Sequence, residues 1–258
     1  MVNKPSGVLT VSANNEFPNL AHAVYDAVVD SCELKDADRM VVHRLGMDTS
    51  GLIVFAKTLD AVRGMNTVFR TRNIERKYEA LVCGHVEKDE GLINLPLMRD
   101  YEYPPYVRVS TDEHQRALVD LDPEIVGKKL LEQPKESVTK YQVVAREEID
   151  GHPVTRVALT SISGRYHQLN CHLAAYGHPI VGDNTYGMNG VAARDGGLTE
   201  AELDEVAPNP NRASAELQRA LSDIDVNANT PCVHAKSLKF RHPVIFSGDI
   251  SINADAPF

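Results

Sequence analysis

The stretch HRLGMDTSGLIVFA, which runs from His43 to Ala56, joins a polar segment directly to an apolar one. Its second part, Leu52 to Ala56, follows a glycine and is a continuous apolar run, which is typical of a buried β-strand. Its first part carries charged and turn-forming side chains, and loops held by a rigid sheet are where binding and catalytic groups concentrate. Taken alone, this part is explained equally well as a structural turn, in which Thr49 and Ser50 bond to backbone groups and Gly51 supplies a permissive φ.

Helical and strand-like patterns alternate irregularly on both sides of this stretch. Apolar residues at helical spacing predict helices over residues 19–32, 58–69 and 167–176. Alternating or β-branched runs predict further strands over residues 77–82, 139–144, 155–159, 237–240 and 244–246. Because the regular spacing of parallel βαβ units is missing, we expect an α+β fold with a mixed sheet.

The composition is that of a globular chain. Its 258 residues are 43% apolar and 24% charged, which is enough to bury a substantial core as one domain and excludes a wholly disordered chain or a fibrous repeat. No run approaches the roughly 18 apolar residues of a membrane span, and the first residues lack the apolar core of a signal peptide. We therefore expect no membrane partner. The four cysteines are far apart in sequence, which favours an intracellular, reducing compartment, the cytoplasm or an organelle.

Charge is distributed unevenly along the chain. The formal net charge of −9 argues against a protein that holds nucleic acid by bulk positive charge. Residues 188–230 carry eight acidic and three basic side chains. A capping-box pattern at Thr199 and a second helical run beginning at Asn211 predict that this segment is a helical acidic insertion on the surface. Residues 63–77 hold five basic side chains and one acid, Glu75, so a local basic face is available on an acidic protein.

The common cofactor and metal motifs are absent from the sequence. It contains no G-x-G-x-x-G, no P-loop, no H-E-x-x-H and no G-x-S-x-G. Cys171 with His172, or Cys232 with His234, could form part of a metal site, which keeps a metal-dependent hydrolase as a formal alternative. Neither pair has a second pair of ligands close in sequence. We therefore expect a reaction that uses no metal and no organic cofactor.

Six stretches, collinear along the chain, together resemble one enzyme family. The stretch from His43 to Gly51 resembles the H-R-L-D-x-x-T-S-G motif of the RluA-type RNA pseudouridine synthases. The other five are Asn3 to Gly7, Lys77 to Gly84, Gly164 to Leu169, Gly177 to Asp183, and His234 to Leu238 with His242-Pro243. One such match would carry little weight, but six in order over most of the chain are not expected by chance.

This resemblance implies a fold and a reaction. The fold would be the α+β catalytic domain of the family, a bent, mainly antiparallel sheet with flanking helices, over residues 1–258 as a single domain without an S4 RNA-binding domain. The reaction would be isomerisation of a uridine within RNA, in which the N1–C1′ bond breaks and the base is rejoined through C5. Family members flip the target nucleotide into a pocket, because its reacting atoms are otherwise stacked in a helix. We expect a monomer that acts on ribosomal or transfer RNA.

The chain departs from the family motif at the catalytic residue. The aspartate of H-R-L-D, which acts on the ribose as nucleophile or base, corresponds to Gly46, and glycine can do neither. Asp48 lies two residues further on, about 6.5 Å along an extended chain, whereas catalysis tolerates displacements nearer about 1 Å. We therefore predict that the chain as written is inactive or impaired. It is either a non-catalytic RNA-binding module on the same fold or a variant of a competent enzyme.

The resemblance also implies roles for other residues. Tyr78 corresponds to the active-site tyrosine, whose ring stacks on uracil and whose hydroxyl is placed for proton transfer at C5; a core aromatic of a strand is the simpler alternative. Arg165 corresponds to the arginine that pairs with the catalytic aspartate, and here it would lack that partner. Arg44 would help to extrude and replace the flipped base, unless it is an arginine in a surface ion pair. The expected substrate-binding set also includes Thr49, His167 and Gln168, the last two by organising the start of a helix.

The RNA backbone is expected to contact the basic run that leads into Tyr78. The run consists of Arg63, Arg70, Arg72, Arg76 and Lys77. Lys4 and Arg44 are expected to contact RNA nearer the pocket. The alternative is that the run is only a solvated face of the protein.

Overall fold

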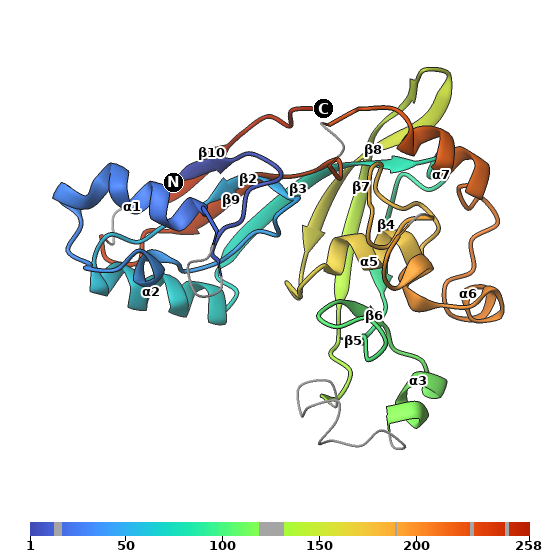
Figure 1. Ribbon diagram of the computed structural model, residues 1–258, viewed down its shortest axis with the longest axis horizontal. Helices are drawn as coiled ribbons and strands as arrows, with labels where there is room; N and C mark the ends of the chain where they lie inside the picture. Colours follow the sequence, from blue (N-terminus) through green and yellow to red (C-terminus); the bar gives the residue numbers. More distant parts are fainter. Residues whose placement is uncertain (13–16, 119–131, 189, 228–229, 246–247) are drawn as a thin grey trace. The chain divides into compact units, whose positions relative to one another are not determined.

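The computed structural model describes residues 1–12, 17–118, 132–188, 190–227, 230–245 and 248–258. The chain divides into two compact units, which we call the first unit, Met1–Glu79 with Val233–Phe258, and the second unit, Ala80–Cys232 (Figure 1). The expected single domain over residues 1–258 stays a prediction.

The described strands include a mixed, mainly antiparallel sheet of eight strands, and its strand β3 (Ile74–Cys83) is shared by the two units. In the first unit the strand order is β1 (Val2–Lys4), β2 (Ser50–Ile53), β9 (Val233–Arg241) and β3, and β10 (Asp249–Asn253) pairs with β9. The β2–β9 pair is parallel, whereas β1–β2 and β9–β10 are antiparallel. The predicted α+β class with a mixed sheet is confirmed.

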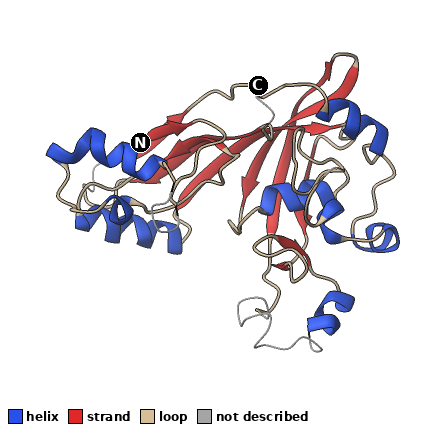
Figure 2. Ribbon diagram, in the orientation of Figure 1, coloured by secondary structure: helices blue, strands red, loops and turns tan. Residues whose placement is uncertain are grey.

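The helices of the first unit, drawn in blue in Figure 2, begin where the sequence predicts them. The Asn19 side chain accepts a hydrogen bond from the His22 N–H at 3.1 Å and caps α1 (Leu20–Val28). Thr58 caps α2 (Leu59–Arg70) by accepting from the Ala61 N–H at 3.1 Å. The first helix was expected to reach residue 32, but a 3-10 turn, η2 (Val29–Ser31), replaces its last part, and a second, η3 (Ala37–Met40), follows.

The sheet of the first unit buries side chains on both of its faces. One face holds a cluster with α2 that consists of Leu52, Val54, Met65, Leu238 and Phe240. Ile53 and Ala235 belong to a second cluster with Leu45, because successive side chains of a strand point to opposite faces. This second cluster contains the residue that directly precedes Gly46.

In the second unit, the end of β3 is followed in strand order by β8 (His152–Ser161), β7 (Val138–Ile149) and β4 (Glu90–Asn94). The β8–β7 and β7–β4 pairs are antiparallel, and the register of β7 on β8 shifts between Val143 and Ala145, which marks a β-bulge. A separate hairpin consists of β5 (Leu97–Arg99) and β6 (Val107–Val109). The strands predicted over 139–144 and 155–159 are the central parts of β7 and β8, whereas β4, β5 and β6 were not predicted.

Most of the helix boundaries that were predicted in the second unit are confirmed. α5 (Gln168–Ala175) is followed by Gly177 with φ +92°, and α6 (Glu200–Val206) has the complete capping box between Thr199 and Glu202. The predicted start at Asn211 is wrong, because Ser214 caps α7 (Ala215–Ser222). The unit also contains α3 (Asp112–Ala117) and the 3-10 turn η5 (Arg194–Gly197). No helix in the described part of the chain is both long and apolar enough to cross a membrane.

Two of the predicted segments include residues that the structure does not describe. Residues 188–230 contain η5, α6 and α7, while residues 189 and 228–229 lie outside the described residues; that the segment is an insertion stays a prediction. The strand predicted over 244–246 is wrong for Val244 and Ile245, because both backbone N–H groups donate to Nδ1 of His242 and form a bend there. Phe246 lies outside the described residues.

Candidate functional site

The C-terminal end of the loop that carries Gly46, at Ser50 and Gly51, is held against β9. Gly51 stands opposite Ala235 in the β2–β9 register with φ +112°, and a Cβ on it would lie 2.4 Å from the Ala235 carbonyl oxygen. The hydroxyl of buried Ser50 donates to the Val233 carbonyl at 3.3 Å and lies 2.8 Å from Nδ1 of buried His234. Both contacts are satisfied together when Nδ1 of His234 carries the ring proton. The T-S-G end of the loop is therefore fixed by backbone approach and by hydrogen bonds.

Lys4 holds the middle of the same loop. Its side chain is 1% exposed, and its ammonium donates to the carbonyls of Pro5 at 2.9 Å, Val8 at 2.8 Å and Met47 at 2.8 Å. Burial lowers the pKa of Lys4 to about 8, and the Asp48 carboxylate acts in the opposite direction. The expected contact of Lys4 with RNA is wrong, because its ammonium is buried and occupied by three carbonyls. Its role in the structure is to position the loop.

Gly46 lies in a turn whose backbone is anchored on both sides. Thr10 Oγ1 donates to the Leu45 carbonyl at 2.9 Å and accepts from the Leu45 N–H at 3.3 Å, and the Gly46 carbonyl accepts from the Thr49 N–H at 3.2 Å. Unlike Gly51, Gly46 does not have a positive φ. The φ at position 46 is therefore not one that favours glycine over other residues. The predicted substrate contacts of exposed Arg44 and half-buried Thr49 stay predictions.

Tyr78 packs beside this loop. It packs against the cluster of Leu45, Ile53 and Ala235, and Leu45 is the residue that directly precedes Gly46. Burial raises the pKa of the Tyr78 hydroxyl above its ordinary value, and the nearby Arg76 guanidinium opposes this shift. The phenol is therefore protonated at neutral pH, which suits a group that donates or relays a proton.

The side chains of Arg76 and His43 both pack against the ring of Phe69, a residue of α2. The Arg76 Cζ lies 5.9 Å from the centre of the Phe69 ring, and the His43 ring lies 4.7 Å from it. His43 Nε2 accepts a hydrogen bond from the Val54 N–H at 2.9 Å, so the imidazole is neutral and its proton is on Nδ1. Burial lowers the pKa of His43 to about 3, and the Arg76 charge adds to the effect. The sequence motif alone did not indicate this positioning role of its first residue.

The basic run is divided between the two faces of β3. Because side chains alternate along a strand, Arg76 shares a face with Tyr78 and Lys77 points the other way. Lys77 forms an exposed ion pair with Glu75 at 2.8 Å. Arg72 is exposed in the turn between α2 and β3, with φ +57°. The structure therefore groups Arg76 with Tyr78 and separates Lys77 from it, and RNA contacts by Arg72, Arg76 and Lys77 stay predictions.

Gln168 organises the loop that precedes α5 in the second unit. Its side chain is 1% exposed, and its Oε1 accepts from the Ser163 hydroxyl at 2.7 Å and the Arg165 N–H at 2.9 Å. Its Nε2 donates to the Val138 carbonyl at 2.9 Å and to Thr139 Oγ1 at 3.0 Å. All of the amide's polar atoms are thus engaged within the protein. This favours a positioning role for Gln168 over the predicted contact with substrate.

Arg165 and His167 lie at the N-terminal end of α5. Arg165 is exposed, and its guanidinium NH2 group donates to the Glu136 carbonyl at 3.5 Å. His167 has φ +48°, and burial lowers its pKa to about 4. Gly46 and Tyr78 belong to the first unit and Arg165 to the second, so the expected approach of Arg165 to position 46 stays a prediction.

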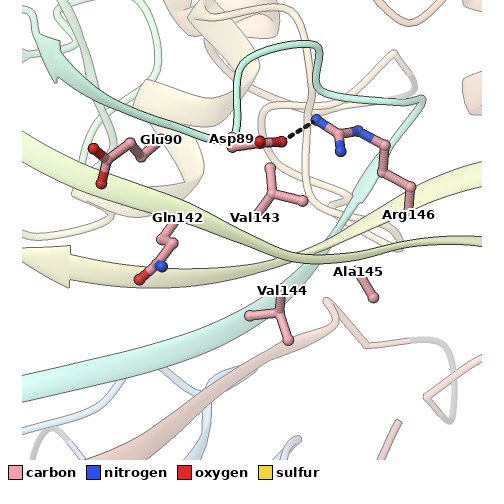
Figure 3. Close-up of a pocket in the computed structure, with 7 residues that line it drawn as sticks. All are labelled: Asp89, Glu90, Gln142, Val143, Val144, Ala145 and Arg146. Carbon is pink, nitrogen blue, oxygen red and sulfur yellow. Dashed lines mark hydrogen bonds and ion pairs between the residues drawn. The ribbon is translucent and has the colours of Figure 1, made fainter.

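Two cavities are lined by other residues. A polar cavity of about 530 Å³ lies at the bulge of β7, lined by Asp89, Glu90, Gln142, Val143, Val144, Ala145 and Arg146 (Figure 3). Arg146 pairs with Asp89 at 2.8 Å and donates to the Val86 and Glu87 carbonyls, so its charge holds the segment before β4. In the first unit, an apolar groove of about 380 Å³ is lined by residues that include Met65 of α2 and Phe240 of β9. None of the predicted site residues lines either cavity.

The histidines considered as metal ligands have hydrogen-bond partners in the fold. Both ring nitrogens of buried His172 are engaged, by Thr139 Oγ1 and the Leu95 carbonyl at 2.9 Å each, and Nδ1 of His234 is bonded to Ser50. Across the described residues, no group of three or more His, Cys, Asp or Glu side chains is arranged to hold a metal ion. The hydrolase alternative gains no support from these side chains.

Comparison with known proteins points to one family. The family described as RNA pseudouridylate synthase matches residues 1–175. The chain is 34% identical over 244 residues to the dual-specificity RNA pseudouridine synthase RluA of Pasteurella multocida, a match that covers 95% of this chain and 83% of that protein. It is 38% identical over 186 residues to the protein of the same name from Haemophilus influenzae, which covers 72% of each.

Two solved structures share the fold. Human RNA Pseudouridylate Synthase Domain Containing 4 is similar with a TM-score of 0.59 at 21% identity, over 99% of this chain and 84% of that chain. Human RNA Pseudouridylate Synthase Domain Containing 1 is similar with a TM-score of 0.57 at 24% identity, over 84% of this chain and 69% of that chain. The fold that the six collinear motifs imply is confirmed.

Proposed function

This chain belongs to the RNA pseudouridylate synthase family of isomerases, and we propose that Gly46 leaves it with an RluA-type site that lacks its catalytic carboxylate. Its substrate is RNA, and we infer that the RNA is ribosomal or transfer RNA, as the resemblance implies. In this proposal the unsubstituted chain binds and everts a uridine but isomerises it slowly or not at all.

One observation carries the proposal: the loop around position 46 is held in place without any side chain at that position. Lys4 binds the Met47 carbonyl, Thr10 binds both polar backbone groups of Leu45, and Gly51 packs on β9. The φ of Gly46 is not positive. The loop is therefore anchored by groups other than a side chain at position 46, and the φ of Gly46 is one that an L-residue with a carboxylate can adopt.

The other groups near the loop do not replace that carboxylate. Glycine has no atom that can attack C1′ of the ribose or accept a proton from it. Asp48 is half-buried, burial raises its pKa, and its charge interacts with the Lys4 ammonium that positions the loop. Tyr78 is suited to stacking and to proton transfer at C5, a step that comes after the glycosidic bond has broken. Binding and base eversion are thus retained while bond cleavage is lost.

The deciding experiment restores the missing group with Gly46→Asp and uses Gly46→Asn as its control. The two variants place side chains of equal size on the same backbone, and only the first supplies a carboxylate. We expect pseudouridine formation on transfer and ribosomal RNA transcripts, measured by nucleoside analysis, to rise about a thousandfold or more in Gly46→Asp. Gly46→Asn should match the unsubstituted chain.

Two outcomes would contradict parts of the proposal. If the unsubstituted chain isomerised uridine as fast as Gly46→Asp, position 46 would not be the missing catalytic group. If Gly46→Asp folded, bound RNA and stayed silent, the chain would be better described as a non-catalytic RNA-binding module on this fold.

A further inference from the structure

A buried hydrogen bond joins the end of the loop around Gly46 to β9. Ser50 is 3% exposed and His234 is 1% exposed. The Ser50 hydroxyl lies 2.8 Å from Nδ1 of His234, and the two residues stand opposite each other in the parallel β2–β9 register. They are 184 positions apart in sequence. The contact therefore ties the first residue of β2 to a strand from the other end of the chain.

The other ring nitrogen of His234 does not explain why a histidine stands at this position. Its Nε2 is buried and makes no hydrogen bond with a described residue. Burial lowers the pKa of His234, and the Ala254 backbone opposes this shift without reaching hydrogen-bond geometry at Nε2. The ring is therefore uncharged at neutral pH, and a buried polar atom without a partner costs free energy that an apolar side chain would avoid. What the imidazole supplies is the contact between Nδ1 and Ser50.

Ser50 is connected directly to the turn that contains position 46. The Thr49 N–H donates to the Gly46 carbonyl at 3.2 Å, which closes a turn over residues 46–49. Ser50 is the next residue, so a shift of Ser50 displaces the end of this turn. Because a misplacement of about 1 Å can cost an enzyme about a hundredfold in rate, a reaction at position 46 is sensitive to this connection.

We propose that His234 is a positioning residue of the pseudouridine synthase site, which acts through Ser50 on the side chain at position 46. The inference rests on the proposed function, in which a carboxylate at that position breaks the glycosidic bond. His234 acts through the loop and does not touch the RNA. Its contribution is therefore to the rate of the chemical step and not to RNA affinity.

The first test measures amide hydrogen exchange by NMR in the unsubstituted chain and in three variants. Ser50→Ala and His234→Leu each remove the hydrogen bond, and each should speed exchange at the Thr49 amide about tenfold. His234→Asn can present either end of its side-chain amide where Nδ1 stands, so it should keep the Thr49 amide protected. The Ala56 amide, which donates to the Met40 carbonyl at 2.9 Å in the same unit, should be unchanged in all three variants.

The second test adds the same substitutions to Gly46→Asp and separates kcat from RNA affinity. His234→Leu should lower kcat about a hundredfold and leave the dissociation constant for the RNA transcript within about threefold. His234→Asn should keep kcat close to that of Gly46→Asp. Since Ser50→Ala removes the same hydrogen bond, adding it to His234→Leu should lower kcat little further.

Thr58→Ala is the control. Thr58 caps α2 in the same unit and makes no hydrogen bond to the loop among the described residues, so its loss destabilises the fold without touching the turn. This variant should change neither Thr49 exchange nor kcat.

Three results would overturn the proposal: unchanged Thr49 exchange in Ser50→Ala and His234→Leu, a kcat of His234→Asn as low as that of His234→Leu, or an equal loss of kcat in Thr58→Ala. The exchange test uses the chain with Gly46, so it decides the role of His234 in holding the turn even if Gly46→Asp stays silent. That silence would count against the proposed function alone.

Discussion

Gly51 and Ala235 approach so closely that no side chain fits between them. A Cβ at position 51 would lie 2.4 Å from the Ala235 carbonyl oxygen and 2.5 Å from its nitrogen. The two residues are paired in the parallel β2–β9 register although they are far apart in sequence. The position of the loop around Gly46 therefore depends on β9, and the glycine that follows T-S is needed for close backbone approach as well as for its φ of +112°.

Gly51→Ala should lower the free energy of unfolding by about 3 kcal/mol, because it adds a backbone clash to a strained φ. Urea denaturation followed by circular dichroism measures the loss. Gly7→Ala is the control: Gly7 also has a positive φ, +76°, but nothing lies within 4 Å of an added Cβ, so the loss should be about 1 kcal/mol. Equal losses would show that the approach to Ala235 contributes nothing.

His43 should make folding stability depend on pH in the acid range. Its folded pKa is lowered from 6.5 to about 3. As pH falls below 6.5 the unfolded chain takes up this proton first, so stability present at neutral pH is lost progressively toward pH 3. His43→Gln cannot bind the proton. The unfolding free energy of the unsubstituted chain, relative to this variant, should therefore fall by about 3 kcal/mol between about pH 6.5 and 4.

The other histidines are present in both proteins, so their titration cancels in the comparison. If the difference in unfolding free energy between the two proteins stayed constant with pH, His43 would not be held neutral in the folded state. The same result would also mean that the hydrogen bond from the Val54 N–H to His43 Nε2 does not explain why the motif begins with a histidine.

Local sequence signals located the helices better than the strands. Asn19, Thr58 and Thr199 each cap the helix that they were expected to start, because a cap depends on residues three apart in sequence. The strands of the β5–β6 hairpin are three residues each, too short for an alternating pattern to be read. In the bend at Val244 and Ile245, hydrogen bonds to one His242 nitrogen override an apolar run that reads as a strand.

The sequence predicted which residues belong to the site but not how their side chains are oriented or buried. The motifs indicated Tyr78 and the loop at Gly46, and the structure groups these two residues through the Leu45 cluster. A linear basic run cannot show that Lys77 points away from Tyr78, because strand alternation becomes visible only once β3 is placed. The sequence likewise did not show that Lys4 is buried. Lys4 was expected to contact RNA, but its ammonium lies 2.8 Å from the Met47 carbonyl oxygen.

Arg212 should be a main source of stability for the acidic segment. Its guanidinium donates to the carbonyls of Ala175 at 3.0 Å, Leu203 at 3.3 Å and Ala207, and so joins the C-terminal ends of α5 and α6. Arg212→Ala leaves these carbonyls without a charged donor and should lower the unfolding free energy by about 2–3 kcal/mol. Arg219→Ala, at an exposed position of α7, should change it by less than about 0.5 kcal/mol. A similar small effect for both variants, in thermal or urea unfolding, would contradict the role given to Arg212.

Asp48 should be dispensable once position 46 carries a carboxylate. In the double variant Gly46→Asp/Asp48→Asn we expect the rate of pseudouridine formation to stay within about threefold of that of Gly46→Asp, because Asp48 acts on Lys4 and not on the ribose. Stability should fall modestly, since the Asp48 charge favours the protonated form of the buried Lys4. A folded double variant with the low rate of the unsubstituted chain would instead make Asp48 a catalytic residue. The single variant Asp48→Asn tests the same point from the other side, because any residual rate of the unsubstituted chain should survive it.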